Sequence, residues 1–189
     1  MLLTSTLLLL AAAAQVPPGF TMARTGNIDD FDYFEGGWST VQHRQTTAAD
    51  GTKSWADFPA TLCAKRYLDG GATVDELLMP TRNQRGLTLR AFDREKRQWS
   101  IYWMNSTTGR LDPIPVVGGF EGQRGEFYAQ DTVGGRPAKV RYLWTIKDRD
   151  HARWEQALSF DDKTWETNWT ADFTRGDTAR LCKEGRPAG

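Results

Sequence analysis

The stretch RWEQALSFDDKTWETNWTADF, Arg153 to Phe173, decides the fold class of this chain. Before and after a short turn, its residues alternate between two faces with the period of a β-strand. One side carries mostly apolar and aromatic groups: Trp154, Gln156, Leu158 and Phe160, then Trp165, Thr167, Trp169, Ala171 and Phe173. The other side is polar and partly charged. The pattern predicts a β-hairpin with one aromatic face.

The turn of this hairpin has a pattern of its own. The segment SFDDKTW, Ser159 to Trp165, resembles the Asp-box hairpin S-x-D-x-G-x-T-W without its Gly and with one residue fewer. In that motif an Asp side chain accepts hydrogen bonds from backbone donors of the turn. The resemblance concerns structure and implies no chemistry.

The same alternation recurs along the chain, for example in RGLTLRAF, RQWSIYWMN and RPAKVRYLWTIK, with short turns between the runs. We expect roughly ten short strands, at the spacing of a sandwich or a barrel. Short connections favour pairing of sequential strands, and closure removes exposed edges. Pro59 indicates an edge or a bulge, because proline lacks a ladder donor. The predicted fold is all-β: one antiparallel barrel, preceded by a short helical segment within Ile28 to Phe34.

A local motif supports closure. Gly36 and Trp38 form a G-x-W pattern at the start of the first strand, directly after the short helical segment. The motif resembles the first strand of lipocalins and other calycins, where the Trp plugs the closed end of the barrel. In those families a basic side chain near the last strand often covers that Trp. Arg175 is placed to stack on the indole of Trp38 in the same way.

A wider resemblance covers about Asp30 to Arg175. The stretches FDYFEGGWST, RGLTLRAFDREKRQWSIYWMN, GRLDP and RYLWT and the opening hairpin together resemble a bacterial family of lipocalin-like proteins of unknown function. The resemblance implies a calycin-type barrel, distantly similar to nitrobindins and fatty-acid-binding proteins. It implies no particular reaction, since a fold does not fix a function.

The termini and the two cysteines suggest export. Residues 2–14 form an apolar run in which Ala12 and Ala14 are placed as an A-x-A cleavage site, so residues 1–14 are predicted to be a signal peptide. An extended leader would follow over 15–27, the barrel over 28–176 and a tail over 177–189. In an exported protein, Cys63 and Cys182 would form a disulfide. The expected location is the periplasm or the medium.

Composition argues against several classes of partner. The 24 basic and 24 acidic side chains balance, so nucleic acid is not expected as a partner. After residues 2–14, no stretch of the sequence is apolar enough to cross a membrane. The two histidines, His43 and His151, lie among polar neighbours and are expected on the surface rather than on haem or a metal. No cofactor is predicted, and the sequence does not determine an oligomeric state.

Two sets of side chains compete for the inside of the barrel, because a bulge would shift the phase of a strand by one residue. The first set is aromatic or apolar: Leu87, Leu89, Trp99, Ile101, Trp103, Val140, Tyr142, Trp144, Trp154 and Trp169. The second set is polar: Arg90, Ser100, Tyr102, Arg141, Glu155 and Asn168. The binary-pattern rule favours the first set inside, with Gln156 beside it. If the second set faced inward, its two arginines would suit a carboxylate.

The function expected is binding of a small apolar or aromatic molecule in the lumen. The candidate ligand-binding residues are Arg90, Trp103, Tyr142, Trp144, Gln156, Asn168 and Trp169. The alternative is an isomerase, cyclase or lyase, in which Glu155 acts as a general base beside Tyr102 and Arg141. A protein-interaction module with a solid interior is a third class. The volume of the cavity and the face that lines it distinguish these interpretations.

Overall fold

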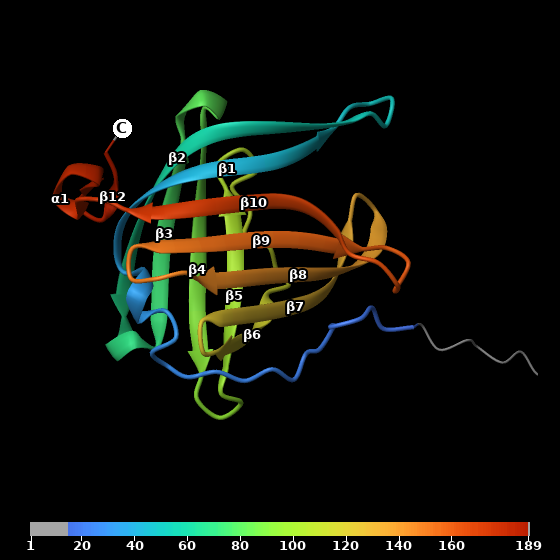
Figure 1. Cartoon of the computed structure of the whole chain (residues 1–189), viewed down its shortest axis with the longest axis horizontal. Coiled ribbons are helices and arrows are strands. Elements are labelled where there is room, and N and C mark those ends of the chain that lie inside the picture. The colour runs from blue at the N-terminus through green and yellow to red at the C-terminus, as the bar shows by residue number, and fades with distance from the viewer. Residues whose placement is uncertain (1–14, 189) are drawn as a thin grey trace, which may run out of the picture.

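The computed structural model describes residues 15–188, and its main body is a closed antiparallel barrel of ten strands (Figure 1). Each strand pairs with the next along the chain, and β10 closes the barrel on β1. The predicted ten-stranded barrel is therefore confirmed. The predicted signal peptide over 1–14 lies outside the described residues. The strands are β1 (Gly36–Thr47), β2 (Lys53–Tyr67), β3 (Ala72–Met79), β4 (Gln84–Asp93), β5 (Gln98–Asn105), β6 (Val116–Glu121), β7 (Arg124–Val133), β8 (Arg136–Ile146), β9 (His151–Ser159) and β10 (Glu166–Arg175).

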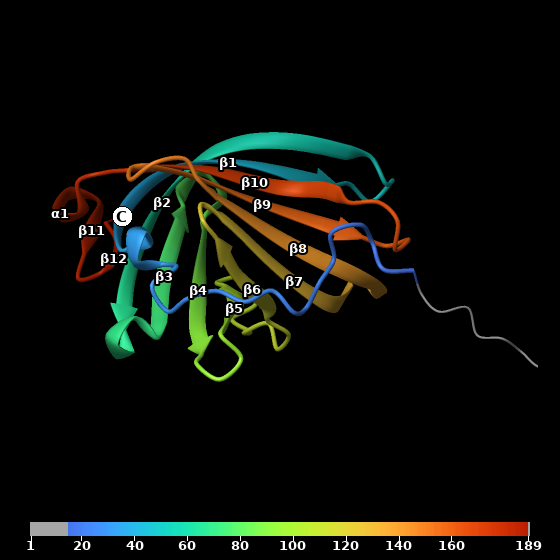
Figure 2. The same cartoon turned by 60° about the horizontal axis from the view of Figure 1, so that its bottom comes forward.

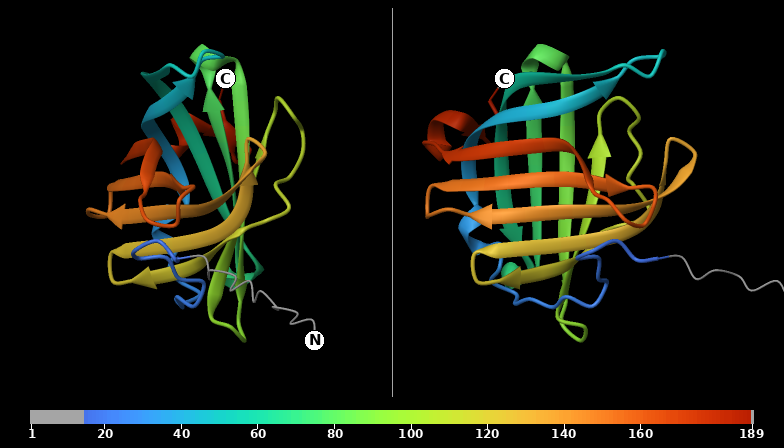
Figure 3. Two further views of the ribbon diagram at one scale, coloured as in Figure 1. Left: turned by 90° about the vertical axis from the view of Figure 1, so that its right-hand side faces the viewer. Right: turned by 45° about the vertical axis from the view of Figure 1, so that its right-hand side comes forward.

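Short elements connect and follow these strands. Three 3-10 turns are η1 (Asp32–Phe34), η2 (Leu68–Gly70) and η3 (Pro80–Arg82), and one short helix is α1 (Thr178–Leu181). The minor strands β11 (Cys182–Lys183) and β12 (Arg186–Pro187) pair with each other beside the barrel. In Figure 3, β7–β10 form one wall and β3–β5 cross behind it. Pro59 lies in the part of β2 that pairs with β1 but not with β3, so the missing donor does not interrupt a ladder on that side.

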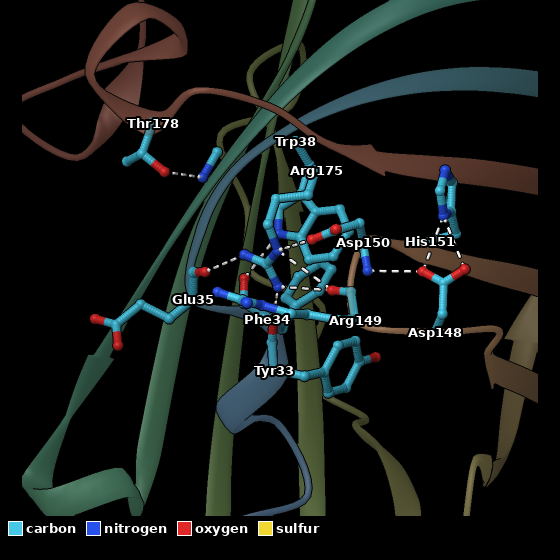
Figure 4. A network of polar contacts seen from close by, with 11 residues as sticks. Tyr33, Phe34, Glu35, Trp38, Asp148, Arg149, Asp150, His151, Arg175 and Thr178 are labelled. Carbon is cyan, nitrogen blue, oxygen red and sulfur yellow. Dashed lines mark hydrogen bonds and ion pairs between the residues drawn. The ribbon is translucent and has the colours of Figure 1, made fainter.

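Trp38 plugs one end of the barrel, as the G-x-W motif predicts. Its side chain is fully buried, its Nε1 donates to the carbonyl of Phe34 (2.9 Å), and its ring stacks on that of Phe34. The guanidinium of Arg175 lies 4.2 Å from the centre of the indole (Figure 4). It also donates to the carbonyls of Tyr33, Glu35 and Arg149. This end of the barrel is therefore closed by a cation–π contact and charge-assisted hydrogen bonds.

The C-terminal tail is tied to the closed end. Cys63 of β2 and Cys182 form a disulfide bond across a Cα–Cα distance of 5.9 Å, which confirms the predicted pairing. The backbone N–H of Gly37 donates to Oγ1 of Thr178 (2.9 Å), so α1 lies against the start of β1. Gly36 has a φ of +113°, a conformation open to glycine and strained for other residues.

Residues 15–27 and the hairpin turn also make defined contacts. Residues 15–27 run in extended form outside the barrel (Figure 2), where Trp165 Nε1 donates to the carbonyl of Pro18 (2.8 Å) and Phe20 packs on Tyr128. In the turn, Asp161 accepts from the backbone N–H groups of Lys163 and Thr164, both at 2.9 Å. The Asp-box resemblance thus describes the turn correctly. Among residues 15–188, no helix has the length and apolar character needed to span a membrane.

Candidate functional site

The barrel encloses a cavity of about 290 Å³. Its walls come from β1–β5 and β8–β10, and a side chain of the β5–β6 loop lies at its rim. The lining side chains are Gln42, Arg44, Leu62, Asp75, Leu77, Thr88, Arg90, Ile101, Trp103, Asn105, Asp112, Tyr142, Trp144, Trp154, Gln156, Trp169, Ala171 and Phe173. The interior is therefore not packed solid, which argues against a protein-interaction module with a solid interior.

Four aromatic side chains form one wall of the cavity. Trp169 makes edge contacts with Trp103 and Trp154, at centroid distances of 6.0 and 5.4 Å, and Trp154 contacts Tyr142 at 5.0 Å. Edge-to-face pairs of this kind add stability beyond their buried area and hold the rings in fixed orientations. The four rings thus offer a preformed apolar surface to a ligand.

Gly86 sets the position of Trp103. A Cβ atom at position 86 would lie 1.8 Å from the indole ring of Trp103 on the neighbouring strand. Only glycine at this position leaves room for the ring against β4. The orientation of this wall therefore depends on a residue that makes no polar contact with the cavity.

A hydrogen-bonded chain holds Trp169 from β1. The indole Nε1 donates to Oε1 of Gln42 (2.8 Å), whose Nε2 donates to Oγ1 of Thr40 (2.8 Å). Thr40 in turn donates to the carbonyl of Ala60. Gln42 is almost completely buried, so these bonds satisfy polar groups that would otherwise be costly inside the barrel.

A buried ion pair lies at the inner end of the cavity. Arg90 of β4 and Asp75 of β3 are 3% and 1% exposed, and Nη1 of Arg90 donates to Oδ2 of Asp75. The guanidinium lies 4.9 Å from the ring centres of both Phe31 and Phe34. Because its partner neutralises it, Arg90 presents no net charge to a ligand. Nε of Arg90, Oδ1 of Asp75 and Nε1 of Trp144 have no hydrogen-bond partner among the described residues.

The phase predicted for β4 is wrong. Leu87 and Leu89 were expected inside, but Thr88 and Arg90 line the cavity and the two leucines lie on the outer face. There Leu89 faces Val74 and Tyr102 across the strands. The cause is the mixed character of the interior: Arg90 is acceptable inside because Asp75 neutralises it, which a pattern of apolar and polar residues cannot show.

On β5, β8, β9 and β10 the aromatic set faces inward. The structure places the candidates Trp103, Tyr142, Trp144, Gln156 and Trp169 in the cavity wall together with Arg90. Asn168 sits at a bulge of β10, where its Oδ1 accepts from Nε2 of Gln156 (2.9 Å). It therefore touches the wall through Gln156.

The three candidate catalytic residues do not form an internal cluster. Tyr102, Arg141 and Glu155 alternate with cavity residues and point to the outer face. Arg141 stacks on Trp165 at 4.5 Å, and Glu155 accepts from Arg153 (3.1 Å). Burial against this outer layer lowers the pKa of Arg141. The arrangement that the enzyme alternative required is not present.

The cavity has a second arginine, which sequence reasoning missed. Arg44 of β1 lies over Trp169, with 4.1 Å from its guanidinium carbon to the ring centre. Among residues 15–188, no carboxylate lies within ion-pair distance of Arg44 or of Arg82 on η3. Burial lowers the pKa of Arg44, and the like charge of Arg82 lowers it further.

The rim of the cavity also carries acidic groups. Asp112, on the β5–β6 loop, is exposed, and both desolvation of its carboxyl group and the charge of Asp131 raise its pKa. Burial raises the pKa of Tyr142 well above its usual value, and the charges of Asp112 and Asp131 act in the same direction. Tyr142 is therefore a neutral hydrogen-bonding group in the cavity wall.

The histidines lie outside this site. His43 pairs with Asp57 and stacks on Trp55 on the outer face, and Nδ1 of His151 donates to Oδ1 of Asp148 (2.9 Å; Figure 4). Both side chains are about half exposed. Over the described part of the chain, no three His, Cys, Asp or Glu side chains gather as they would around a metal ion.

The residues that the sequence did not single out are Asp75, Gln42, Arg44 and Asp112. Arg44 and Gln42 had a signal: counting by twos from the buried Trp38 brings both to the inner face. Asp75 and Asp112 had none, because their roles depend on strand pairing and on the course of a loop. Comparison of the chain with protein-family models and with curated proteins finds no match in either.

Proposed function

We propose that this barrel binds a small molecule with an aromatic or apolar body in its lumen. The observation that carries the proposal is the cavity of about 290 Å³ walled by Trp103, Tyr142, Trp154 and Trp169. Its volume is just below the range of ligand pockets, roughly 300–1,000 Å³. At roughly 30 Å³ per water molecule, it has room for about ten waters or a bicyclic aromatic molecule.

The wall favours a flat ligand. Rigid aromatic side chains give a large apolar contact area and lose little conformational freedom on binding. Polar groups of Gln156, Asn105 and Tyr142 line the same space and are available to orient the ligand. Binding is favoured over acid–base catalysis because Glu155, Arg141 and Tyr102 face away from the cavity.

Export and a lipocalin-like kinship are parts of the same proposal. The Cys63–Cys182 disulfide supports export, because disulfides persist in oxidising compartments. The closed antiparallel barrel, with Trp38 under Arg175 at one end, is compatible with a calycin-type fold. The proposed location is the periplasm or the medium.

Filling the cavity tests the proposal. Ala171 lies in the cavity wall on β10, and Ala171→Phe would place a ring in the space of the ligand. Thr174→Phe adds the same ring to the exposed outer face of the same strand and serves as the control. Naphthalene, 2-naphthamide and 2-naphthoate are titrated by calorimetry, and each melting temperature is measured with and without ligand.

We expect saturable binding of at least one probe to the native protein and to Thr174→Phe, and its loss in Ala171→Phe. Trp169→Ala should weaken the binding, because it removes the centre of the aromatic wall. If no probe binds, or if Ala171→Phe binds as well as the native protein, the lumen is not the binding site.

A further inference from the structure

Arg44 and Arg90 both line the cavity, but they differ in whether an acidic side chain neutralises their charge. Arg90 is paired with Asp75 in the almost completely buried inner end. Arg44 has no acidic partner within ion-pair distance among residues 15–188, and none of its guanidinium nitrogens donates a hydrogen bond to another described residue. A partly buried cation without a partner is costly, and a bound anion would offset that cost.

A second positive charge lies close to Arg44. Arg82 stacks on Phe58, at 4.4 Å from its guanidinium carbon to the ring centre, and is near enough to Arg44 to lower its pKa. It too lacks an ion-pair partner in the described part of the chain. Asp112, the other acidic group of the lining, lies on the β5–β6 loop and is not within ion-pair distance of Arg44 or Arg82 among the described residues.

We infer that the ligand carries an acidic group, such as a carboxylate, and that Arg44 binds it. This inference rests on the proposed function and names the chemical class of the ligand. The guanidinium of Arg44 already lies over the ring of Trp169, at the edge of the aromatic wall. A ligand with an aromatic body against Trp103, Trp154 and Trp169 would thus bring its acidic group to Arg44. A guanidinium can hold a carboxylate through two parallel hydrogen bonds.

The test compares two ligands of the same shape, of which one carries a carboxylate and the other a neutral amide. 2-Naphthoate and 2-naphthamide have the same bicyclic body and nearly the same size. Charge-assisted hydrogen bonds contribute about 1.5–3 kcal/mol, so the native protein should bind the acid roughly ten- to a hundredfold more tightly than the amide. Raising the salt concentration should weaken binding of the acid more than binding of the amide.

Three variants assign the effect to Arg44. Arg44→Gln should abolish the preference for the acid, and Arg44→Lys should keep part of it because the charge remains. Arg136→Gln is the matched control, since Arg136 stacks on Phe160 at 4.5 Å outside the cavity lining and also lacks an ion pair in the described residues. It should leave the preference intact. Circular dichroism and melting temperature show whether each variant is folded.

Equal binding of acid and amide by the native protein would overturn the inference while leaving the proposed function in place. A preference for the acid that survives in folded Arg44→Gln would also overturn it, since another group would then bind the carboxylate. If none of the probes binds, both the inference and the proposed function fail. The comparison on the native protein needs no variant, so misfolding of Arg44→Gln does not remove the test.

Discussion

Breaking the buried Asp75–Arg90 pair should strongly destabilise the barrel. Both side chains are at least 97% buried, and the other groups around Arg90 are Thr73 Oγ1 at 3.4 Å and the aromatic rings. Asp75→Leu leaves a desolvated guanidinium without a counter-charge, and Arg90→Met leaves a carboxylate in the same position. Each single change should reduce the free energy of unfolding by about 3–5 kcal/mol.

The double variant separates charge from packing. Asp75→Leu with Arg90→Met replaces the pair by apolar groups, a change that is often neutral or stabilising when the shape is kept. We expect the double variant to be more stable than either single variant, with a coupling energy of at least about 2 kcal/mol. The exposed pair Lys53–Glu166, at 2.7 Å, is the control, and its cycle should give no more than about 1 kcal/mol.

Urea unfolding followed by tryptophan fluorescence, with the disulfide kept intact, measures these differences. Similar m-values across the series would show that the variants unfold in the same way. A loss below about 1 kcal/mol for Asp75→Leu, within the range of ordinary surface changes, would refute the assignment of this pair to the desolvated interior. A double variant as unstable as the sum of the two singles would show that shape, and not charge, sets the cost.

Three further predictions concern the closed end, the disulfide and the hairpin turn. Trp38→Ala should cost about 3–5 kcal/mol in urea unfolding, because the indole is fully buried, and a loss within about 0.5 kcal/mol would contradict its role as the plug. Reduction should add two hydrogens to the intact mass and lower stability by about 4 kcal/mol, since the bond joins residues 119 apart; an unchanged mass would mean free thiols. Backbone donors lower the pKa of Asp161 to about 2 from its ordinary 3.8, so its carboxylate stabilises the turn fully above pH 4 and loses this effect as the pH falls through about 2. NMR of the carboxyl group should show a titration midpoint near 2, and a midpoint near 3.8 would exclude the hydrogen bonds.

The fold could be predicted from local patterns, because strand period, turn residues and the G-x-W motif are all properties of short segments. The same holds for the inward direction of Trp103 and Trp154. On β10 the bulge at Asn168 interrupts the alternation, so Trp165, predicted on the same face as Trp169, packs outside the barrel against Pro18 and Arg141. The orientation of β4 could not be predicted in this way. In LTLRAF the apolar rule places Leu87 and Leu89 inside, but the pairing of Arg90 with Asp75 on β3 reverses the phase.

The polar half of the cavity depends on contacts between strands that are distant in the sequence. Arg44 lies 125 positions before Trp169, and the two meet because β10 closes on β1 with Arg44 opposite Trp169 in the register. Nothing in the sequence near Arg44 indicates whether an acidic side chain pairs with it. The charge of the cavity lining, and therefore the chemistry of the ligand, could be inferred only from the closed barrel.

The indole N–H signals of tryptophan in ¹⁵N NMR test ligand binding in the lumen most directly, because they report separately on the inside and the outside of the barrel. The protein is titrated with 2-naphthamide and 2-naphthoate. We predict saturable shifts of the signals of Trp103, Trp154 and Trp169, which line the cavity, while Trp55, which is exposed beside His43, stays unchanged. Shifts confined to Trp55, or no saturable shift with either probe, would contradict the account.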